Sequence, residues 1–433
     1  MTGFIFTMQT ASKKVINGWA FYDWANSTYS LVITSTLFPA YYLSIAPGRI
    51  NLLGRTYDRD SLASYTIAAS FLIIAFLSPV LSSIADYKGN KKAFMRFFCY
   101  LGSVSCAAMF FFNESSVGFG LLLSMLASIG YCGSIVFYNA YLPEIATEED
   151  QDRISARGFA MGYAGSVILM VLSLAFIMLN ENMGWGLGSL PVRTSFVVVG
   201  LWWAGFAQIT FKRLPPSKAS EARPEHNIFT NGFYELKKVW IQLTNYPTLK
   251  RFLRSFFFYN MGVQTVMYMA PYFGKDELKL ESTQMIITIL IIQLVAIAGA
   301  WLFSIVSKKT NNIFALCCIV IMWIGICIYA YNTVTVTEFY ILALLVGLVM
   351  GGVQSMSRST YSKLLPETKD TASYFSFYDV CDKIGTVIGT ITFGYVAEIF
   401  DGMRNSILAL MGYFIIGLIL LLFVRMKSKL KFV

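Results

Sequence analysis

Ionisable side chains inside long apolar stretches are the residues of this chain best suited to chemistry. They are Asp23, Arg358, Asp379, Asp382 and Lys383. A charged group in hydrocarbon is costly, so such a residue faces protein or water and marks a solute or ion pathway by default. Asp379 and Lys383 are four residues apart with the acid first, the order that favours an ion pair on a helix. We therefore expect these five residues to handle charge or protons.

Structural alternatives exist for several of these residues. The Asp379–Lys383 pair could serve only to neutralise charge so that the helix inserts, but that leaves Asp382 unexplained. Arg358 lies about one turn from the cytoplasmic end of its stretch, so its long side chain could reach the lipid headgroups. Asp23 and Asp379 both lie roughly 12 Å deep at 1.5 Å of rise per residue. Because desolvation favours the neutral form of an unpaired carboxylate, either is a candidate proton carrier, with Lys383 as counter-charge.

Uncharged polar side chains also recur at helical spacing within the apolar stretches. Asp23, Asn26 and Ser30 share one face of the first stretch. The residues that we predict to contact a solute are Asn26, Ser30, Tyr138, Asn139, Asn260, Gln264, Tyr268 and Gln354. The alternative is hydrogen bonding between helices that only holds a bundle together.

Other chemistry has little support in the sequence. His226 is the single histidine, and the 7 cysteines lie in apolar segments without metal-ligand spacing. No nucleophile–base set and no phosphate-binding loop are found. We therefore expect no enzyme activity, no cofactor and no metal.

The composition identifies the setting of these residues. Of 433 residues, 56% are hydrophobic and 13% are charged, and the mean hydropathy is +0.59. Soluble proteins carry about 25% charged residues, so a water-soluble chain is excluded and a multi-pass membrane protein is expected. The net charge of +10 is carried by clusters between apolar runs, which indicates membrane topology rather than a nucleic-acid partner.

The apolar runs predict an all-α fold with twelve transmembrane helices, each about 20 residues long. Their expected limits are 17–45, 61–85, 93–112, 117–142, 155–180, 194–212, 250–273, 283–306, 312–331, 337–362, 371–399 and 405–424. A polar stretch divides them into an N-terminal half at 1–212, a cytoplasmic loop at 213–249 and a C-terminal half at 250–433. Most Lys and Arg residues then fall on the side of both termini, which predicts cytoplasmic termini in an inner membrane. The N-terminus has no cleavable signal pattern, so the first span is expected to be retained.

An internal repeat supports the division into halves. Leu142-Pro143-Glu144 recurs as Leu365-Pro366-Glu367 about half a chain later. Six spans repeated in parallel are the plan of transporters whose solute lies between the halves.

Charged residues gather in the loop after the second span and in the acidic stretch after the fourth, and the acidic stretch is a candidate gate. The residues concerned are Asp86, Gly89, Lys91, Lys92, Glu144, Arg153 and Arg157. The acidic stretch, taken as a loop, could pair with Lys363 or Lys369 across the halves, or it could simply be solvated. The loop at 307–310 lacks the Asp and Gly of its first-half counterpart, which argues against a symmetric gate.

These motifs carry a family resemblance. Asp86-Tyr-Lys-Gly89-Asn-Lys91-Lys92 resembles the D-x-x-G-x-[RK]-[RK] loop of the major facilitator superfamily. Within it, the chain is similar to the fungal vacuolar amino-acid effluxers linked to autophagy and to their bacterial relatives. That similarity rests on the runs at 18–27, 137–144, 153–163, 351–359 and 375–380.

The repeat predicts alternating access, and the polar span faces favour a polar solute. The resemblance implies export of a small solute, with amino acids as the substrate class. It also implies that the loop at 86–92 is a gate, with Asp86 holding the outward-open state. Peptides, sugar fragments and amphipathic compounds remain alternative substrates. A transporter-like receptor or assembly factor remains an alternative function, although no loop is long enough for the extra domain that it would need. The expected partners are the solute, the lipid bilayer and protons. The sequence leaves the oligomeric state open, with a monomer expected.

Overall fold

The computed structural model describes residues 9–424 except 53, 218, 220–233, 235–236 and 401. His226 and much of the predicted loop at 213–249 therefore lie outside the described residues. Within them the only strands are β1 (Arg49–Leu52) and β2 (Arg55–Asp58), which pair as an antiparallel hairpin. The rest of the regular structure is helical, as the sequence predicts.

The first crossing is one continuous helical segment with three parts. It consists of α1 (Lys13–Thr28), the π-helix η1 (Tyr29–Leu37) and α2 (Phe38–Ile45). The later long helices are α3 (Arg59–Lys88), α4 (Lys91–Ala108), α5 (Val117–Ala140), α7 (Glu148–Met183), α8 (Leu190–Arg213), α10 (Pro247–Asp276), α11 (Ser282–Lys309), α12 (Asn312–Asn332), α13 (Val336–Leu364), α14 (Thr371–Ile399) and α15 (Met403–Leu422). Short elements are η2 (Met109–Phe111), η3 (Glu114–Ser116) and α6 (Leu142–Ile145).

This element order is consistent with the expected twelve crossings. Among the residues that the structure describes, 9 helices are long and apolar enough to cross a membrane by length and composition alone. The crossings outside that set are the first, α10 and α14. They contain Asp23, Asn260, Gln264, Asp379 and Lys383, the polar residues predicted to form the site. The membrane-spanning pattern is therefore weakest in the helices that carry the candidate chemistry.

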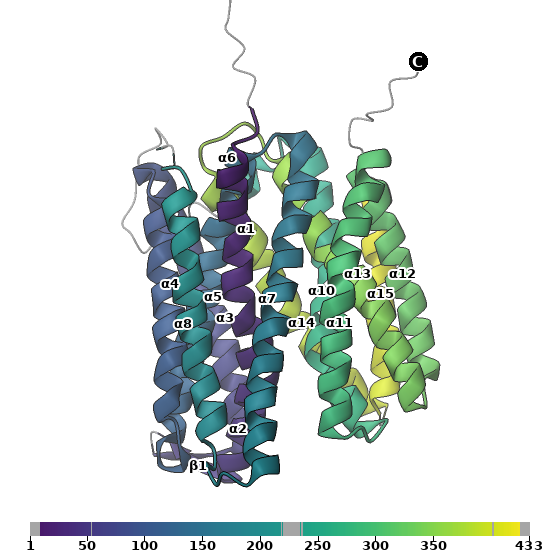
Figure 1. Cartoon of the computed structure of the whole chain (residues 1–433). Helices are drawn as coiled ribbons and strands as arrows, with labels where there is room; N and C mark the ends of the chain where they lie inside the picture. The colour runs from purple at the N-terminus through teal and green to yellow at the C-terminus, as the bar shows by residue number, and fades with distance from the viewer. Residues whose placement is uncertain are drawn as a thin grey trace, which may run out of the picture.

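The long helices form a bundle of two sets (Figure 1). In the N-terminal set, α1 packs on α7 and α8, and α4 packs on α5 and α8. In the C-terminal set, α10 packs on α14 and α15, and α11 packs on α13. Helix α7 contacts α11 and α13, and α14 contacts α3 and α5, so these helices form the interface between the sets. The limits 1–212, 213–249 and 250–433 themselves stay a prediction.

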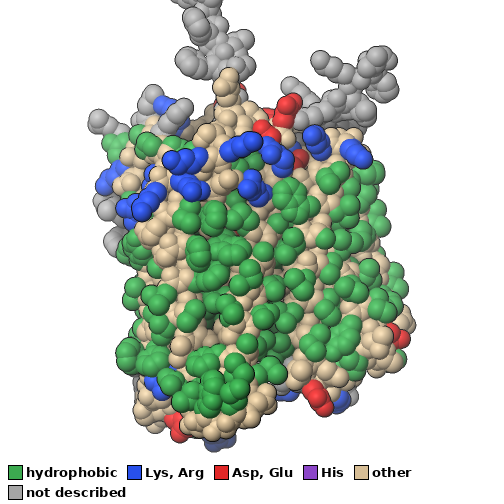
Figure 2. Space-filling view, viewed as in Figure 1, with side chains coloured by type: hydrophobic (Ala, Val, Ile, Leu, Met, Phe, Trp, Pro, Cys, Tyr) green, Lys and Arg blue, Asp and Glu red, His purple; other side chains and the backbone are tan. Residues whose placement is uncertain are grey.

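The two ends of the bundle differ. The start of α1, helix α6 and the end of α15 lie at the end that we call the basic end, and the β1–β2 hairpin lies at the opposite end, the hairpin end (Figure 1). On the face drawn in Figure 2, Lys and Arg gather at the basic end above a wide hydrophobic band. This distribution is the one that the charge argument uses to place the basic end in the cytoplasm.

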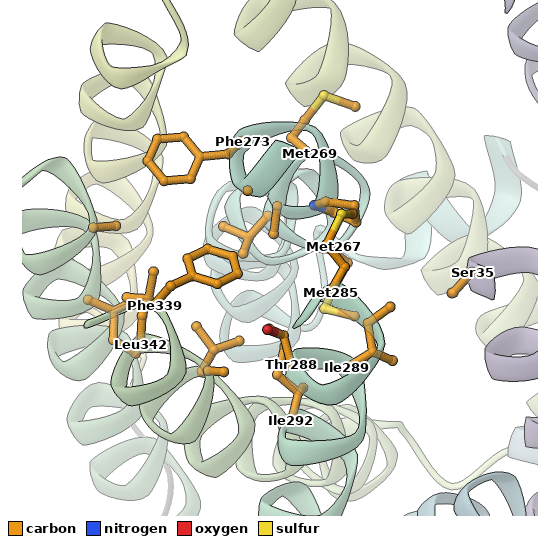
Figure 3. Close-up of a pocket in the computed structure, with 18 of the residues that line it drawn as sticks. Ser35, Met267, Met269, Phe273, Met285, Thr288, Ile289, Ile292, Phe339 and Leu342 are labelled. Carbon is orange, nitrogen blue, oxygen red and sulfur yellow. The ribbon is translucent and has the colours of Figure 1, made fainter. Parts of the chain in front are cut away.

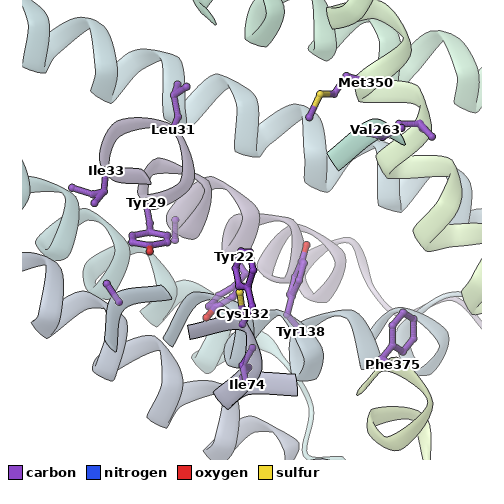
Figure 4. Close-up of a cluster of buried hydrophobic side chains, with 14 of the residues drawn as sticks. Tyr22, Tyr29, Leu31, Ile33, Ile74, Cys132, Tyr138, Val263, Met350 and Phe375 are labelled. Atoms are coloured by element: carbon purple, nitrogen blue, oxygen red, sulfur yellow. The ribbon is translucent and has the colours of Figure 1, made fainter. Parts of the chain in front are cut away.

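Aromatic packing fills the N-terminal set around the first crossing. The ring of Tyr138 stacks on Trp19 at 4.4 Å between centroids and lies 5.1 Å from the ring of Tyr22. Figure 4 shows Tyr29, Leu31 and Ile33 projecting in different directions from the wide turn that follows α1. That turn is the nine-residue π-helix η1, a form that is rare in proteins and frequent at functional sites.

Close helix contact holds the C-terminal set. A Cβ added to Gly351 of α13 would overlap the backbone of Ala296 in α11, and one added to Gly299 of α11 would overlap the backbone of Leu348. The two helix backbones therefore touch, which is the usual role of small residues at a membrane helix interface.

One expectation about local structure is wrong. The sequence pattern around Glu148 and Arg153 predicts an acidic loop, but α7 begins at Glu148 and includes this stretch. Glu148, Glu149 and Asp150 occupy the first turn, where negative charge is stabilised by the helix dipole. Acidic composition at this position therefore favours a helix start.

Candidate functional site

A cavity of about 910 Å³ lies between the two helix sets. At the hairpin end its lining includes Arg59, Ser61 and Lys275, and at its inner limit it reaches Asn139 and Arg358. Six of the residues predicted to contact a solute line it: Ser30, Asn139, Asn260, Gln264, Tyr268 and Gln354. The structure thus brings polar side chains from several helices of both sets into one space.

The charged residues of α14 form a cluster on the cavity wall. Lys383 Nζ lies 2.7 Å from Asp382 Oδ2 and 3.4 Å from Asp379 Oδ1. Asp382 also accepts hydrogen bonds from Asn260 Nδ2 at 2.5 Å and Gln264 Nε2 at 2.8 Å. Asp379 Oδ2 is buried and has no hydrogen-bond partner within the described part of the chain. The two acids therefore differ, because both oxygens of Asp382 have partners and only one oxygen of Asp379 does.

A second charged pair closes the cavity toward the basic end. Arg358 of α13 places Nη1 and Nη2 each 3.2 Å from Asp23 Oδ2 of α1. Asp23 also accepts from the Tyr138 hydroxyl at 2.7 Å. Arg358 further donates to Asn139 Oδ1 at 3.3 Å and to the Ser155 carbonyl at 2.9 Å. One side chain of the C-terminal set thus ties together α1, α5 and α7 of the N-terminal set.

Of the two roles considered for Arg358, the structure contradicts the one in which its side chain reaches the headgroups. Its side chain is only 3% exposed, and its guanidinium lies over the rings of Phe159 at 4.1 Å and Trp19 at 4.8 Å. Helix α13 continues to Leu364, more than one turn beyond Arg358. The carboxylate of Asp23 offers Arg358 a closer and stronger partner.

Two predicted solute contacts, Asn26 and Tyr138, do not line the cavity. Asn26 is 1% exposed and accepts from Ser27 Oγ. The Tyr138 hydroxyl donates to Asp23, and its ring stacks on Trp19. The predicted stripe along the first crossing assumes a uniform period of 3.6 residues. The π-helix η1 changes that period, and its hydroxyls at Ser35 and Thr36 bond to carbonyls five residues earlier. Ser30, inside η1, therefore lines the cavity while Asn26 packs within the N-terminal set.

Gln354 of α13 lies on the cavity wall and accepts from the Tyr163 hydroxyl of α7 at 2.6 Å. Tyr268 of α10 also lines the cavity from the C-terminal set, and its ring centre lies 6.3 Å from that of Phe71 in α3. These contacts also cross between the two sets.

The predicted gating loop contacts the start of α14. Asp86 accepts hydrogen bonds from the backbone amides of Ala372 at 3.2 Å and Ser373 at 2.8 Å, and from Ser373 Oγ at 2.8 Å. Amide groups in the first turn of a helix have no partner within the helix and attract negative charge. Asp86 of α3 therefore binds the first turn of α14. We call this group of contacts, which includes those of Lys91 and Glu144, the α14 latch.

Lys91 connects the other members of the α14 latch. Its fully buried ammonium lies 3.1 Å from Asp86 Oδ1 and 2.5 Å from Glu144 Oε1, and it donates to Thr371 Oγ1 at 2.7 Å. Gly89 adopts φ +62, and a Cβ there would meet the Ala219 amide nitrogen at 2.8 Å. Lys92 donates to the Leu214 carbonyl. The loop is thus fixed against both α14 and the chain that follows α8.

A second group of contacts joins the sets at the same end, and Asp152 of α7 is its centre. It accepts from Lys363 Nζ at 2.5 Å, Ser307 Oγ at 2.7 Å and Asn312 Nδ2 at 2.7 Å. We call these contacts the α7 latch. The acidic stretch does pair with Lys363, but the sequence pattern alone does not single out the acid concerned. Asp152 differs from the other acids of the first two turns of α7 by its place in the helix, and it is 6% exposed.

The two latches involve loops at corresponding positions of the two halves, but the acid lies on opposite sides of the contact. The loop at 307–310 lacks the acid of its first-half counterpart, yet Ser307 still contacts a helix of the other set, because the acid stands on that helix instead. The predicted gating residues Arg153 and Arg157 lie on α7 outside these contacts. The Arg153 side chain is 61% exposed and pairs with Asp150 one turn away, and Arg157 is half-buried.

A smaller cavity of about 130 Å³ lies in the C-terminal set and has a different character. Figure 3 shows Met267, Met269, Met285 and Phe339 lining it, with Ser35 of η1 on the far side. Its wall offers few polar groups, so it is unsuited to a polar solute. In the described part of the chain, no group of three or more His, Cys, Asp and Glu side chains is arranged to hold a metal ion.

Known proteins are similar to this chain over most of its length. The sequence profile of the family described as "Vacuole effluxer Atg22 like" matches residues 11–431. The uncharacterized MFS-type transporter YxiO of Bacillus subtilis (strain 168) is 32% identical over 424 residues, which cover 96% of this chain and 96% of that protein. Autophagy-related protein 22-2 of Aspergillus oryzae is 23% identical over 463 residues and covers 86% of this chain and 75% of the relative.

Solved structures show the same fold. The fucose:proton symporter FucP of E. coli superimposes with a TM-score of 0.69 at 12% identity and covers 96% of this chain and 98% of that one. FucP is a major facilitator superfamily transporter. The bundle therefore has the major facilitator fold, as the sequence predicts.

Proposed function

Because the chain belongs to the vacuole effluxer Atg22-like family, we propose that it exports a small polar solute, with amino acids as the substrate class. The protein is a multi-pass membrane protein of the MFS transporter type. Of the proteins described above, YxiO is an MFS-type transporter and FucP is a symporter. We propose the solute class, the direction of transport and the coupling ion in turn below.

One observation carries this proposal. The polar cavity extends from the hairpin end to Arg358 and Asn139, and two latches join the helix sets at the basic end. A site between two halves that is reached from one side only is what alternating access requires. With the basic end in the cytoplasm of an inner membrane, this conformation is the outward-open one, from which an exported solute leaves.

Protons are the proposed coupling ion, and Asp379 is the carrier that we favour over Asp23. Asp23 accepts from Arg358 and Tyr138, so its charge is compensated in this conformation. Asp379 has one oxygen without a donor among the described residues, and a buried carboxylate of this kind gains most from taking up a proton. Lys383, between Asp379 and Asp382, supplies the internal counter-charge.

Transport in proteoliposomes tests the proposal. The purified chain is reconstituted with a labelled amino-acid mixture, and uptake is followed with and without an imposed pH gradient. We expect uptake above protein-free vesicles and a change in accumulation when the gradient is applied. Asp379→Asn is expected to remove the response to the gradient. A wild-type protein that transports but ignores the gradient contradicts the coupling, whatever the variant does.

A further inference from the structure

Asp379, a residue of the cavity wall, has one carboxylate oxygen without a hydrogen-bond donor among the described residues. The residue lines the cavity and is 7% exposed. Its Oδ1 atom lies 3.4 Å from Lys383 Nζ, while Oδ2 has no donor within the described residues. Buried carboxylate oxygens are normally satisfied by hydrogen bonds, and an exception calls for an explanation. A ligand donor is one explanation, because the residue borders the space that a solute would fill.

The charge balance of the inner cavity points to a positive ligand. Arg358 and Asp23 compensate each other. The cluster on α14 contains two carboxylates and one ammonium, and Asp382 holds that ammonium more closely than Asp379 does, at 2.7 Å against 3.4 Å. One negative charge is thus left over, and it is concentrated on Asp379.

An anionic group would find no comparable partner at this depth among the described residues. The guanidinium of Arg358 already contacts Asp23, Asn139 and Ser155, and Lys383 already contacts both acids of its cluster. A solute carboxylate would have to displace one of these bonds. The remaining cations of the cavity lining, Arg59 and Lys275, lie at the hairpin end.

The wall of the inner cavity is rich in aromatic rings, which favour cations electrostatically. The aromatic lining residues include Phe71, Tyr131, Phe159, Phe256, Tyr268 and Tyr378. Two of them already face protein cations: Lys383 Nζ lies 5.5 Å from the Phe71 ring centre, and Arg358 lies 4.1 Å from that of Phe159. The other four rings have no protein cation over them among the described residues, so their faces suit the ammonium or guanidinium group of a solute.

We propose that the cavity selects solutes of net positive charge, whose ammonium or guanidinium group donates to Asp379 Oδ2. This inference rests on the proposed function, because it assigns a substrate class to the same cavity. It narrows polar solutes to basic amino acids and organic amines, and it disfavours neutral zwitterions and anions.

A series of ligands tests the charge selection on the wild-type protein. Binding of agmatine, L-arginine and L-citrulline to the purified full chain is measured by isothermal titration calorimetry. Citrulline nearly matches arginine in shape but replaces the guanidinium with a neutral group, and agmatine keeps the guanidinium and lacks the carboxylate. We expect agmatine and arginine to bind roughly 10-fold or more tightly than citrulline, the effect of a hydrogen bond to a charged group. Equal affinities, or no binding of either cation, overturn the proposal.

Variants test the anchoring residue. Asp379→Asn is expected to weaken agmatine binding by roughly 10- to 100-fold. Glu114→Gln removes an exposed carboxylate at the hairpin end and serves as the matched control, with unchanged affinity expected. Agmatine binding that survives Asp379→Asn at full strength overturns the role of Asp379.

Transport in proteoliposomes distinguishes a failure of the charge selection from a failure of the proposed function. Charge-selective binding without transport in proteoliposomes upholds the selection and contradicts the proposed function. Transport of citrulline as well as arginine upholds the proposed function and contradicts the selection.

Discussion

Asp379 and Asp382 are less than one helical turn apart on α14, but they differ in the hydrogen-bond donors that surround their carboxylates. Asp382 accepts from Asn260, Gln264 and Lys383, so its charge is stabilised by groups of its own protein. Asp379 keeps one oxygen without a donor among the described residues, and it lies on the cavity wall. The same residue type thus serves as an anchor for Lys383 in one case and as an open acceptor in the other.

The buried pair of Asp23 and Arg358 leads to a prediction about the stability of the protein. Arg358→Met leaves Asp23 as an uncompensated buried charge, which typically costs about 3–5 kcal/mol. We expect a lower midpoint of thermal unfolding in detergent for this variant. Asp23→Asn combined with Arg358→Met removes both charges, so it is expected to recover part of the loss. A double variant no more stable than Arg358→Met alone would show that the two charges are not coupled.

Cavity residues give a second prediction. Gln264→Ala removes one donor to Asp382 and one polar group from the cavity wall. A hydrogen bond between neutral groups contributes about 0.5–1.5 kcal/mol, so solute affinity should fall roughly 2- to 12-fold. Asn26→Ala is the matched control, because Asn26 is an amide that packs away from the cavity, and the affinity of this variant should not change. A similar loss in both variants would mean that the effect is not local to the cavity.

At the scale of elements, the two latches use opposite arrangements to join the sets. In the α14 latch the acid stands on α3, at the start of the loop, and binds the first turn of α14 in the other set. In the α7 latch the acid stands on α7, and the donors come from α11, α12 and α13. Both latches join the two sets at the basic end in this conformation.

The α14 latch predicts a conformational effect of Asp86→Asn. The charge at the helix start contributes about 0.3–1 kcal/mol, so its loss should raise the population with an open basic end by roughly 2- to 5-fold. Ser78 and Ser376 face each other across the sets at 3.1 Å and are buried, so a Ser78→Cys reporter should label faster in the Asp86→Asn background. Asp150→Asn is the control, because the bonds of Asp150 among the described residues go to Thr10 and Arg153 of its own set. Equal labelling in the Asp86→Asn and control backgrounds contradicts a gating role.

At the scale of the whole molecule, one orientation governs the interpretation of the cavity. The gathering of Lys and Arg at the basic end (Figure 2) favours a cytoplasmic location for that end. In that orientation the cavity would be outward-open. A reversed orientation would make the same cavity inward-open and would reverse the interpretation of both latches.

Site-directed labelling in intact cells tests this orientation. Ser116 ends η3, between α4 and α5, and Asn332 ends α12, whereas Ser217 contacts Gly89 and Lys91 at the basic end. Cysteines at Ser116 and Asn332 should react with an impermeant reagent, and a cysteine at Ser217 should react only after permeabilisation. Labelling of Ser217→Cys from outside would reverse the orientation.

Features that depend on local composition can be predicted from the sequence alone. Apolar length predicts the helices, and α12 runs from Asn312 to Asn332 where the predicted limits are 312 and 331, because hydrocarbon thickness fixes how long an apolar run must be. The cost of charge in lipid singles out Asp23, Arg358, Asp379, Asp382 and Lys383 in the same way, because it depends only on residue type and on the apolar run around it.

The pairing of these groups, in contrast, depends on the tertiary structure. Arg358 pairs with Asp23 although 335 residues separate them, and no local pattern encodes a contact between two helix sets. The π-helix η1 changes the facing of Asn26 and Ser30, because the sequence pattern assumes a constant helical period. The difference between Asp379 and Asp382 likewise depends on donors from α10, which reach one acid and not the other.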